Sequence, residues 1–293
     1  MPTMRLLTAM ITPYYDNMEI NYSKAAEISE MLADNGSDGI VVCGTTGESP
    51  VLSHDEKLKL YQTVKKQVGD RIQVWAGTGS NNTRATVELT SEAEKTGVDG
   101  IMLVTPYYNK PSQQGLYEHF KTAAESTSLP VMLYNIPGRT STNLLPETVA
   151  RLAEISNIVA IKEASGSMDQ VTLLKTILPD TMAVYSGDDS LTLPMMAIGA
   201  AGVVSIASHL IGKEIKQMIE YFLAGDINKA REIHLRIFPI IKGLFITTNP
   251  VPLKEALNML NMNVGGLRLP LTGASEAEKE RIREMLKDNN ILK

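Results

Sequence analysis

The sequence contains one cysteine, Cys43, so it cannot form an internal disulfide bond, which is typical of proteins in a reducing compartment. It has no apolar run near the roughly 20 residues of a membrane-spanning helix, and its first residues lack the features of a secretory signal. An excess of basic residues is missing too, because the formal net charge is -5. We therefore expect a cytoplasmic protein that binds neither membrane nor nucleic acid.

What the sequence does contain is a short apolar strand followed by an amphipathic helix, repeated eight times. Eight such units predict an α/β fold of the (β/α)8 TIM-barrel type. The rival, an open doubly wound sheet, would carry a glycine-rich dinucleotide loop after its first strand, where this chain has Thr12-Pro13-Tyr14-Tyr15. We expect the strands at Leu6–Thr12, Gly39–Cys43, Gln73–Gly77, Gly100–Val104, Val131–Asn135, Ile158–Lys162, Met182–Ser186 and Gly202–Ile206.

Helices are expected between these strands, and several carry start signals. Ser53 with Glu56 forms a capping-box pattern, and Pro146 suits a first helical turn. Beyond residue 225 the pattern is helical only. We therefore predict a barrel catalytic domain over 1–225 and a C-terminal α-helical extension over 226–293. Its helices are expected at Ile227–Leu235, Pro252–Asn261 and Ser275–Lys287, with a break at Pro239.

Lys162 lies at the end of the sixth expected strand, in the stretch NIVAIKEASG at 157–166. A buried lysine is unusual unless it has a partner. One interpretation is a side chain that reaches the rim or pairs with Glu163. The other is a lysine that forms a Schiff base with a carbonyl substrate, for which burial favours the required free amine.

Active residues of such barrels lie at the carboxyl ends of the strands, so residues at the other strand ends are candidates for the same site as Lys162. Thr45 and Thr46, in GTTGES, fit either a glycine turn or a cradle for a carboxylate. Tyr107 and Tyr108 suit packing or catalysis. Arg139 suits a rim salt bridge or a clamp on a substrate carboxylate.

Other strand-end residues argue against metal and cysteine chemistry. Asp188 and Asp189 are adjacent and lack clustered histidines, so we expect no metal and no cofactor. Cys43 has no nearby histidine to activate it. Tyr134, by contrast, ends the strand beside that of Lys162 and could pass protons to and from a carbonyl adduct. A lysine, tyrosines, threonines and an arginine at one rim favour carbonyl chemistry on a carboxylate-bearing substrate.

These residues occur in the motifs GTTGES, TPYYNKPSQ, YNIPGRT, IKEASG, SGDD and GVVS, in this order. Over its whole length the sequence resembles the dihydrodipicolinate synthase and N-acetylneuraminate lyase family of class I aldolases. Within the family, Arg139 and the second threonine favour condensation of pyruvate with L-aspartate 4-semialdehyde, in the diaminopimelate route to lysine. Lysis of sialic acid or a 2-keto-3-deoxy sugar acid is an alternative. A barrel that binds a small acid for regulation, without catalysis, is another.

The resemblance also implies a role for individual residues. Lys162 would form the pyruvate Schiff base and Tyr134 would be the proton donor and acceptor. Thr45 and Tyr108 would complete a proton relay, with Tyr108 reaching the site of a neighbouring subunit in a homotetramer built as a dimer of dimers. The substrate-binding residues implied are Thr46, Arg139, Gly187 and the main chain at Val204.

A regulatory site follows from the same resemblance. Inhibited members of the family bind lysine between subunits, with residues that match Ser49, His54, Asn81 and Tyr107. They place a carboxylate where this chain has Ala85, and commonly a histidine where it has Lys57. Because Ala85 offers no charge and Lys57 repels a cation, we expect weak or absent inhibition by lysine.

Overall fold

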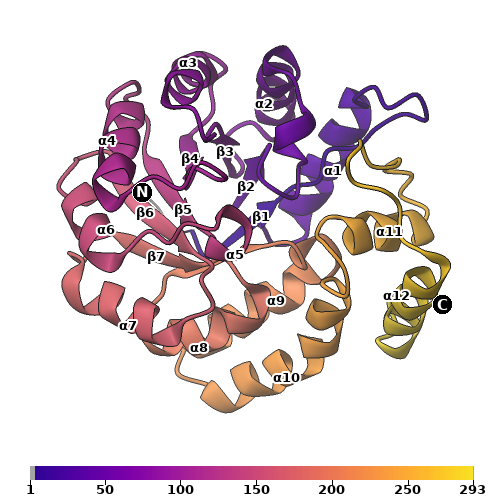
Figure 1. Cartoon of the computed structure of the whole chain (residues 1–293). Coiled ribbons are helices and arrows are strands. Elements are labelled where there is room, and N and C mark those ends of the chain that lie inside the picture. Colours follow the sequence, from indigo (N-terminus) through magenta and orange to yellow (C-terminus); the bar gives the residue numbers. More distant parts are fainter. Residues whose placement is uncertain (1–3, 293) are drawn as a thin grey trace.

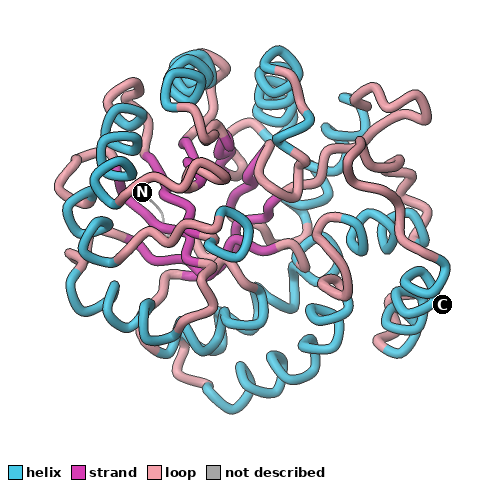
Figure 2. Tube along the Cα trace, in the orientation of Figure 1, coloured by secondary structure: helices cyan, strands magenta, loops and turns pink. Residues whose placement is uncertain are grey.

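Eight parallel strands close into a barrel in sequence order, with helices around it (Figures 1 and 2). The computed structural model describes residues 4–292. It confirms the (β/α)8 barrel and the C-terminal helices expected from the sequence. The strands are β1 (Leu6–Ala9), β2 (Gly39–Val42), β3 (Gln73–Gly77), β4 (Gly100–Val104), β5 (Val131–Asn135), β6 (Ile158–Glu163), β7 (Ala183–Ser186) and β8 (Gly202–Ser205).

The first strand is shorter than expected, because β1 ends at Ala9 although the apolar run continues to Thr12. Past the strand, the Met10 N–H still donates to Val41, and the Thr12 hydroxyl donates to the Gly47 carbonyl at 2.7 Å. The residues stay buried without continuing the ladder. The apolar run therefore predicted correctly which residues are buried, but it overestimated the length of β1.

The helices of the barrel cover the outer face of the sheet. The capping box at Ser53 and Glu56 is present, and Pro146 occupies the first turn of α6. A short helix, α5, follows β5 directly and was not predicted. The barrel helices are α1 (Tyr22–Asp34), α2 (His54–Val68), α3 (Thr83–Glu94), α4 (Gln113–Ala124), α5 (Pro137–Thr140), α6 (Pro146–Leu152), α7 (Met168–Ile177), α8 (Thr192–Ala197) and α9 (Ser208–Leu223).

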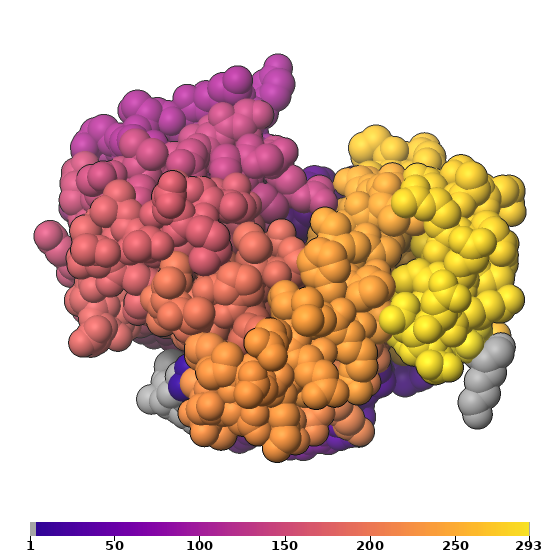
Figure 3. Space-filling model, turned by 90° about the horizontal axis from the view of Figure 1, so that it is seen from below, coloured from indigo at the N-terminus to yellow at the C-terminus, as the bar shows by residue number. Residues whose placement is uncertain are grey.

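Three further helices follow α9: α10 (Ile227–Gly243), α11 (Val251–Met259) and α12 (Glu276–Asp288). They form the orange and yellow part of the surface in Figure 3. The expected break at Pro239 is wrong, because α10 runs through it. A proline removes one helical hydrogen bond. Ile237, Ile240 and Ile241 are buried on both sides of it, and their packing keeps the helix continuous.

The division into a barrel domain (1–225) and a C-terminal helical domain (226–293) stays a prediction. Apolar residues of α10 to α12 belong to the same hydrophobic core as the barrel. The outermost residues of these ranges, 1–3 and 293, lie outside the described part. Within residues 4–292, no helix combines the length and apolar character needed to cross a membrane.

His209 links the first and last units of the barrel. Its ring lies just after β8, with Nδ1 2.9 Å from the Ile206 carbonyl, while Nε2 accepts the Ile11 N–H at 3.3 Å. One nitrogen must donate and the other accept, so the ring is neutral. Burial lowers its pKa to about 4, which agrees with this bonding.

This pKa predicts acid destabilisation. Between roughly pH 6.5 and pH 4 the unfolded state binds a proton at residue 209 that the folded state does not. The free energy of unfolding should therefore fall with pH, by about 2–3 kcal/mol from this group. Denaturant titrations from pH 7 to pH 4 should show a shallower decline in His209→Asn. His54→Asn, at an exposed position, is the control; parallel curves for wild type and His209→Asn would contradict the prediction.

Candidate active site

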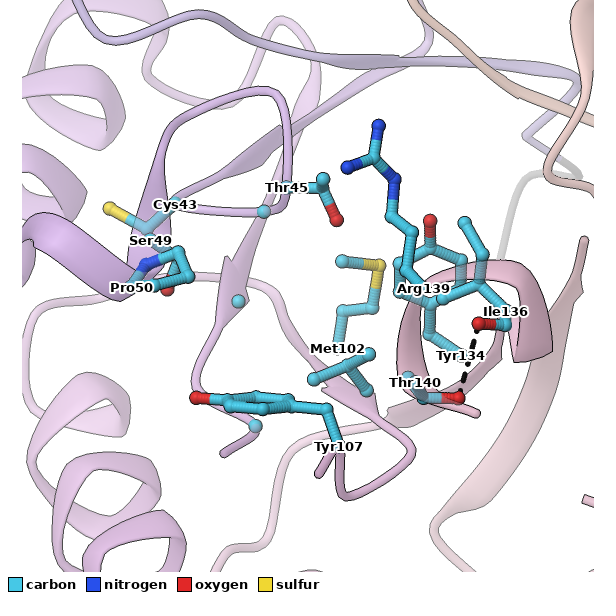
Figure 4. Close-up of a pocket in the computed structure, with 14 residues that line it drawn as sticks. Cys43, Thr45, Ser49, Pro50, Met102, Tyr107, Tyr134, Ile136, Arg139 and Thr140 are labelled. Carbon is cyan, nitrogen blue, oxygen red and sulfur yellow. Dashed lines mark hydrogen bonds between the residues drawn. The ribbon is translucent and has the colours of Figure 1, made fainter. Parts of the chain in front are cut away.

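A cavity of about 240 Å³ opens at the carboxyl ends of strands β2 to β5 (Figure 4). Its wall combines apolar side chains with a few polar groups that converge on one space, as small-molecule sites do. Of the residues expected in the site, the wall includes Thr45, Tyr134 and Arg139, together with Ser49 and Tyr107. Cys43, Met102, Val104, Ile136 and Thr140 also line it.

Lys162 and Tyr134 lie side by side, as the strand order predicted. They are register partners in β6 and β5, and the Lys162 amine lies 4.2 Å from the centre of the Tyr134 ring. The lysine side chain is buried and forms no ion pair with any carboxylate in the described part of the chain. No carboxylate therefore competes with a substrate carbonyl for this amine.

The interpretation that Lys162 pairs with Glu163 is wrong. Glu163 points to the other face of β6, where its carboxylate accepts hydrogen bonds from Asn135 (3.0 Å), Gln170 (3.0 Å) and the Ser165 N–H (2.6 Å). Strand alternation separates the two side chains. The carboxylate is therefore satisfied elsewhere, and the lysine amine stays free.

Gly187 lies against the stem of Lys162. A Cβ built on this glycine would be 3.1 Å from Lys162 Cε and 2.6 Å from Ala164 Cβ. The position has no room for a side chain unless Ala164 and the lysine stem move. The place expected for Gly187, at the wall beside the lysine, agrees with this contact.

The two threonines of the GTTGES loop differ in what they face. Thr45 lines the cavity. Thr46 is buried outside the cavity wall, and its hydroxyl accepts a hydrogen bond from Asn249 Nδ2 at 3.0 Å. Thr45 is thus available to a ligand, whereas Thr46 also connects the loop to the C-terminal helices.

Arg139 stands at the rim on α5, and in Figure 4 its guanidinium points toward Thr45. Nη2 donates to the Asn249 carbonyl at 3.2 Å. Within residues 4–292 the side chain has no acidic partner, so the salt-bridge interpretation is wrong for this chain. The remaining donors of the planar guanidinium are free for a carboxylate.

Five of the expected catalytic and substrate-binding residues are not part of the cavity wall: Lys162, Thr46, Gly187, Val204 and Tyr108. Lys162 is connected to the wall through its contact with the Tyr134 ring. Val204 is buried in β8, and its contact with a substrate stays a prediction. Tyr108 is 88 % exposed, with a left-handed φ of 73°. Its expected role in catalysis at the site of a neighbouring subunit also stays a prediction.

The residues expected at a regulatory site fall into two groups. Ser49 and Tyr107 line the cavity described above. His54 instead bonds Glu92 at 3.0 Å on the exposed face of α2, and the Asn81 carbonyl accepts from Asn109 Nδ2 at 2.8 Å.

Three residues determine the charge that a bound lysine would meet at the expected regulatory site. Ala85 is exposed, as expected for a surface position of α3. Glu88, one turn further along α3, pairs with Arg84 at 2.8 Å. Burial lowers the pKa of Lys57. The Glu88 carboxylate is therefore already engaged by an arginine.

Cys43, Asp188 and Asp189 are buried or hydrogen-bonded within the protein. Burial raises the pKa of the Cys43 thiol to about 12, so it stays protonated and is not a nucleophile at neutral pH. Asp189 is buried and binds the Ser205 hydroxyl and the Ile206 N–H. Asp188 accepts from the Ser190 N–H at 2.9 Å. No metal-binding cluster of His, Cys, Asp or Glu occurs among residues 4–292.

An unpaired lysine beside a tyrosine, at the carboxyl rim of a (β/α)8 barrel, defines a protein of the class I aldolase type. The chain belongs to the dihydrodipicolinate synthetase family, whose sequence model matches residues 2–289. It is 60 % identical over 288 residues to 4-hydroxy-tetrahydrodipicolinate synthase of Desulforudis audaxviator, covering 98 % of each chain.

Solved structures agree with this assignment. Dihydrodipicolinate synthase from Bacillus anthracis is 49 % identical, with a TM-score of 0.96 and 98 % of each chain covered. The enzyme from Cyanidioschyzon merolae, crystallised with lysine bound, is 44 % identical, with a TM-score of 0.97 and 99 % of each chain covered.

The contact between Gly187 and Lys162 gives a prediction. In Gly187→Ala the new methyl group overlaps Ala164 and presses on the Lys162 stem, so trapping of a pyruvate adduct by borohydride should slow by about 10- to 100-fold. Gly138→Ala is the matched control, because a Cβ there meets no atom within 4 Å. Circular dichroism should show folded protein in both. Equal trapping rates in the two variants would contradict the geometry.

Proposed function

We propose that the chain is a lyase of the class I aldolase type that makes 4-hydroxy-tetrahydrodipicolinate from pyruvate and L-aspartate 4-semialdehyde. This is a step of the diaminopimelate route to lysine, and we place it in the cytoplasm. The single observation that carries the proposal is the buried Lys162 amine, without a carboxylate partner, lying over the Tyr134 ring. The names of the relatives support the same activity.

The first half of the reaction uses Lys162 and Tyr134. The amine attacks the keto carbon of pyruvate, and the carbinolamine loses water to give an imine. Tyr134 gives the proton that leaves with the water, and Thr45 extends the relay at the cavity wall. The pyruvate carboxylate lies by Thr46, with Val204 and Gly187 at the sides of the subsite.

The second half joins the aldehyde. Tyr134 takes a proton from the methyl carbon, which turns the imine into an enamine. The enamine attacks the aldehyde carbon, and the aldehyde oxygen takes a proton from Tyr134 to become a hydroxyl. Arg139 holds the carboxylate of the semialdehyde through its free donors. The amino group of the semialdehyde then attacks the imine carbon, so the ring closes and the Lys162 amine is released.

Assays with different second substrates test this proposal. Purified enzyme with pyruvate should consume L-aspartate 4-semialdehyde, and Arg139→Ala should lose about 10- to 150-fold in kcat/KM for the aldehyde. Sialic acid and 2-keto-3-deoxy sugar acids should not be cleaved. Cleavage of either would favour the lyase alternative, and an inactive protein that binds pyruvate would favour the regulatory one.

Covalent trapping tests the role of Lys162. Borohydride added with pyruvate should attach one reduced pyruvyl group per chain, and peptide mapping should place it on Lys162. Lys162→Ala should take no label and keep its fold. Lys254 is an internal control: it is also buried, but Glu48 binds its amine at 2.7 Å. A label on Lys254, or on both lysines, would contradict the assignment.

The exposed position of Tyr108 supports a homotetramer in which this residue acts across a subunit interface. Tyr108→Phe and Lys162→Ala should each be nearly inactive. When the two variants are mixed one to one, about half of the subunit pairs are hybrids, and each hybrid has one complete site out of two. Activity should therefore recover to about a quarter of wild type. Sedimentation should show tetramers. Hybrids that form without activity would place Tyr108 in its own chain's site.

Feedback by lysine should be weak or absent. The missing carboxylate at Ala85 removes an ionic hydrogen bond of about 1.5–3 kcal/mol, and repulsion by Lys57 adds about 1 kcal/mol. Together they weaken binding by roughly 70-fold or more. Initial rates at saturating pyruvate, with L-lysine up to the millimolar range, measure this. Strong inhibition by lysine at concentrations below about 1 mM would contradict this prediction. The variant Glu88→Ala would then show whether Glu88 supplies the missing carboxylate.

A further inference from the structure

Glu48 belongs to the GTTGES motif, but the reaction described above gives it no role. It lies two residues after Thr46, is 2 % exposed and has a left-handed φ of 57°. A residue other than glycine in this conformation needs contacts that hold it there. Its side chain does not line the cavity.

Both carboxylate oxygens of Glu48 are bound by the C-terminal segment. Oε1 lies 2.7 Å from the Lys254 amine, on α11, and Oε2 accepts the Arg268 N–H at 3.0 Å. The Lys254 amine also donates to the Gly266 carbonyl at 2.6 Å and lies 4.2 Å from the centre of the Tyr14 ring. Glu48 and Lys254 are each about 2 % exposed, so water does not compete for this ion pair.

The backbone transmits this anchoring to the threonines. The Glu48 N–H donates to the Thr45 carbonyl at 3.0 Å, which closes the turn that contains both threonines. The Asn249 amide fixes the Thr46 hydroxyl from the same C-terminal segment. Glu48 is the one charged residue of the GTTGES turn, and it is buried.

We propose that Glu48 is a positioning residue, which, through its ion pair with Lys254, holds the Thr45-Thr46 turn in the geometry that binds and activates pyruvate. The inference rests on the proposed function of these threonines. It makes α11 and the segment after it a part of the active site, although they lie outside the barrel.

Double substitution separates positioning from stability. Glu48→Gln and Lys254→Met each leave one buried charge without a partner, so both should lower the melting temperature and slow pyruvate trapping. The double variant removes both charges, and its melting temperature should recover toward wild type. If Glu48 positions the turn, trapping in the double variant stays about 10- to 100-fold slow. The pyruvate KM should rise more than kcat falls, because the threonines bind pyruvate.

The chain offers a matched control at the other end of the barrel. Asp38 pairs with Lys216 at 2.5 Å and accepts the backbone N–H groups of Arg5 and Leu6. This repeats the lysine and backbone partners of Glu48 at the opposite end of the barrel from the site, with side chains that are 23 % and 28 % exposed. Asp38→Asn with Lys216→Met should change the melting temperature and leave the trapping rate unchanged.

The outcomes distinguish the failure of each proposal. If wild type traps no pyruvate, the proposed function fails. If wild type reacts and the Glu48→Gln/Lys254→Met protein is equally fast, Glu48 has a purely structural role and the inference is overturned. Should the double variant not fold, Glu48→Asp decides: it keeps the charge but withdraws the carboxylate by one methylene. Slow trapping in folded Glu48→Asp supports positioning, and a wild-type rate overturns it.

Discussion

Closure of eight parallel strands into a barrel is the constraint on which the rest of the structure depends. It brings every strand's carboxyl end to one rim and places inward side chains of neighbouring strands in contact. Val104, Tyr134 and Lys162 occupy matching register positions on β4, β5 and β6. The same closure buries the lysine stem, so the fold holds the amine beside the Tyr134 ring.

The parts of this arrangement that depend on neighbours in sequence could be predicted. Consecutive strands of a barrel are adjacent, so the meeting of Tyr134 with Lys162 followed from the strand assignment alone. Element ends were less predictable, because burial and strand pairing are different properties. Residues after Ala9 are buried without pairing, and α10 passes through Pro239 because apolar packing on both sides outweighs one lost hydrogen bond.

Contacts between distant segments could not be predicted. Glu48 and Lys254 are 206 residues apart, and Thr46 and Asn249 are 203 apart. Nothing in the local pattern around Lys254, in an amphipathic helix, distinguishes it from a surface lysine. The motif GTTGES marked a functional loop, but it did not show that the support of this loop comes from outside the barrel. Asn249 contacts Arg139 of the YNIPGRT motif as well as Thr46 of the GTTGES motif, and this link exists only in the folded chain.

The two buried lysines show what distinguishes a reactive amine from a structural one. Burial lowers the pKa of Lys254 to about 8, while the charge of Glu48 opposes this change. Its amine is nevertheless closed in by Glu48, by the Gly266 carbonyl and by an aromatic ring, so no carbonyl carbon can approach. Lys162 is buried to a similar degree, but its neighbours are the Tyr134 ring and the bare backbone of Gly187, which leave the amine without a competing acceptor. Burial alone therefore does not make a lysine nucleophilic in this fold. Lys162 differs from Lys254 in having no carboxylate beside its amine, because Glu163 is bound on the opposite face of the strand.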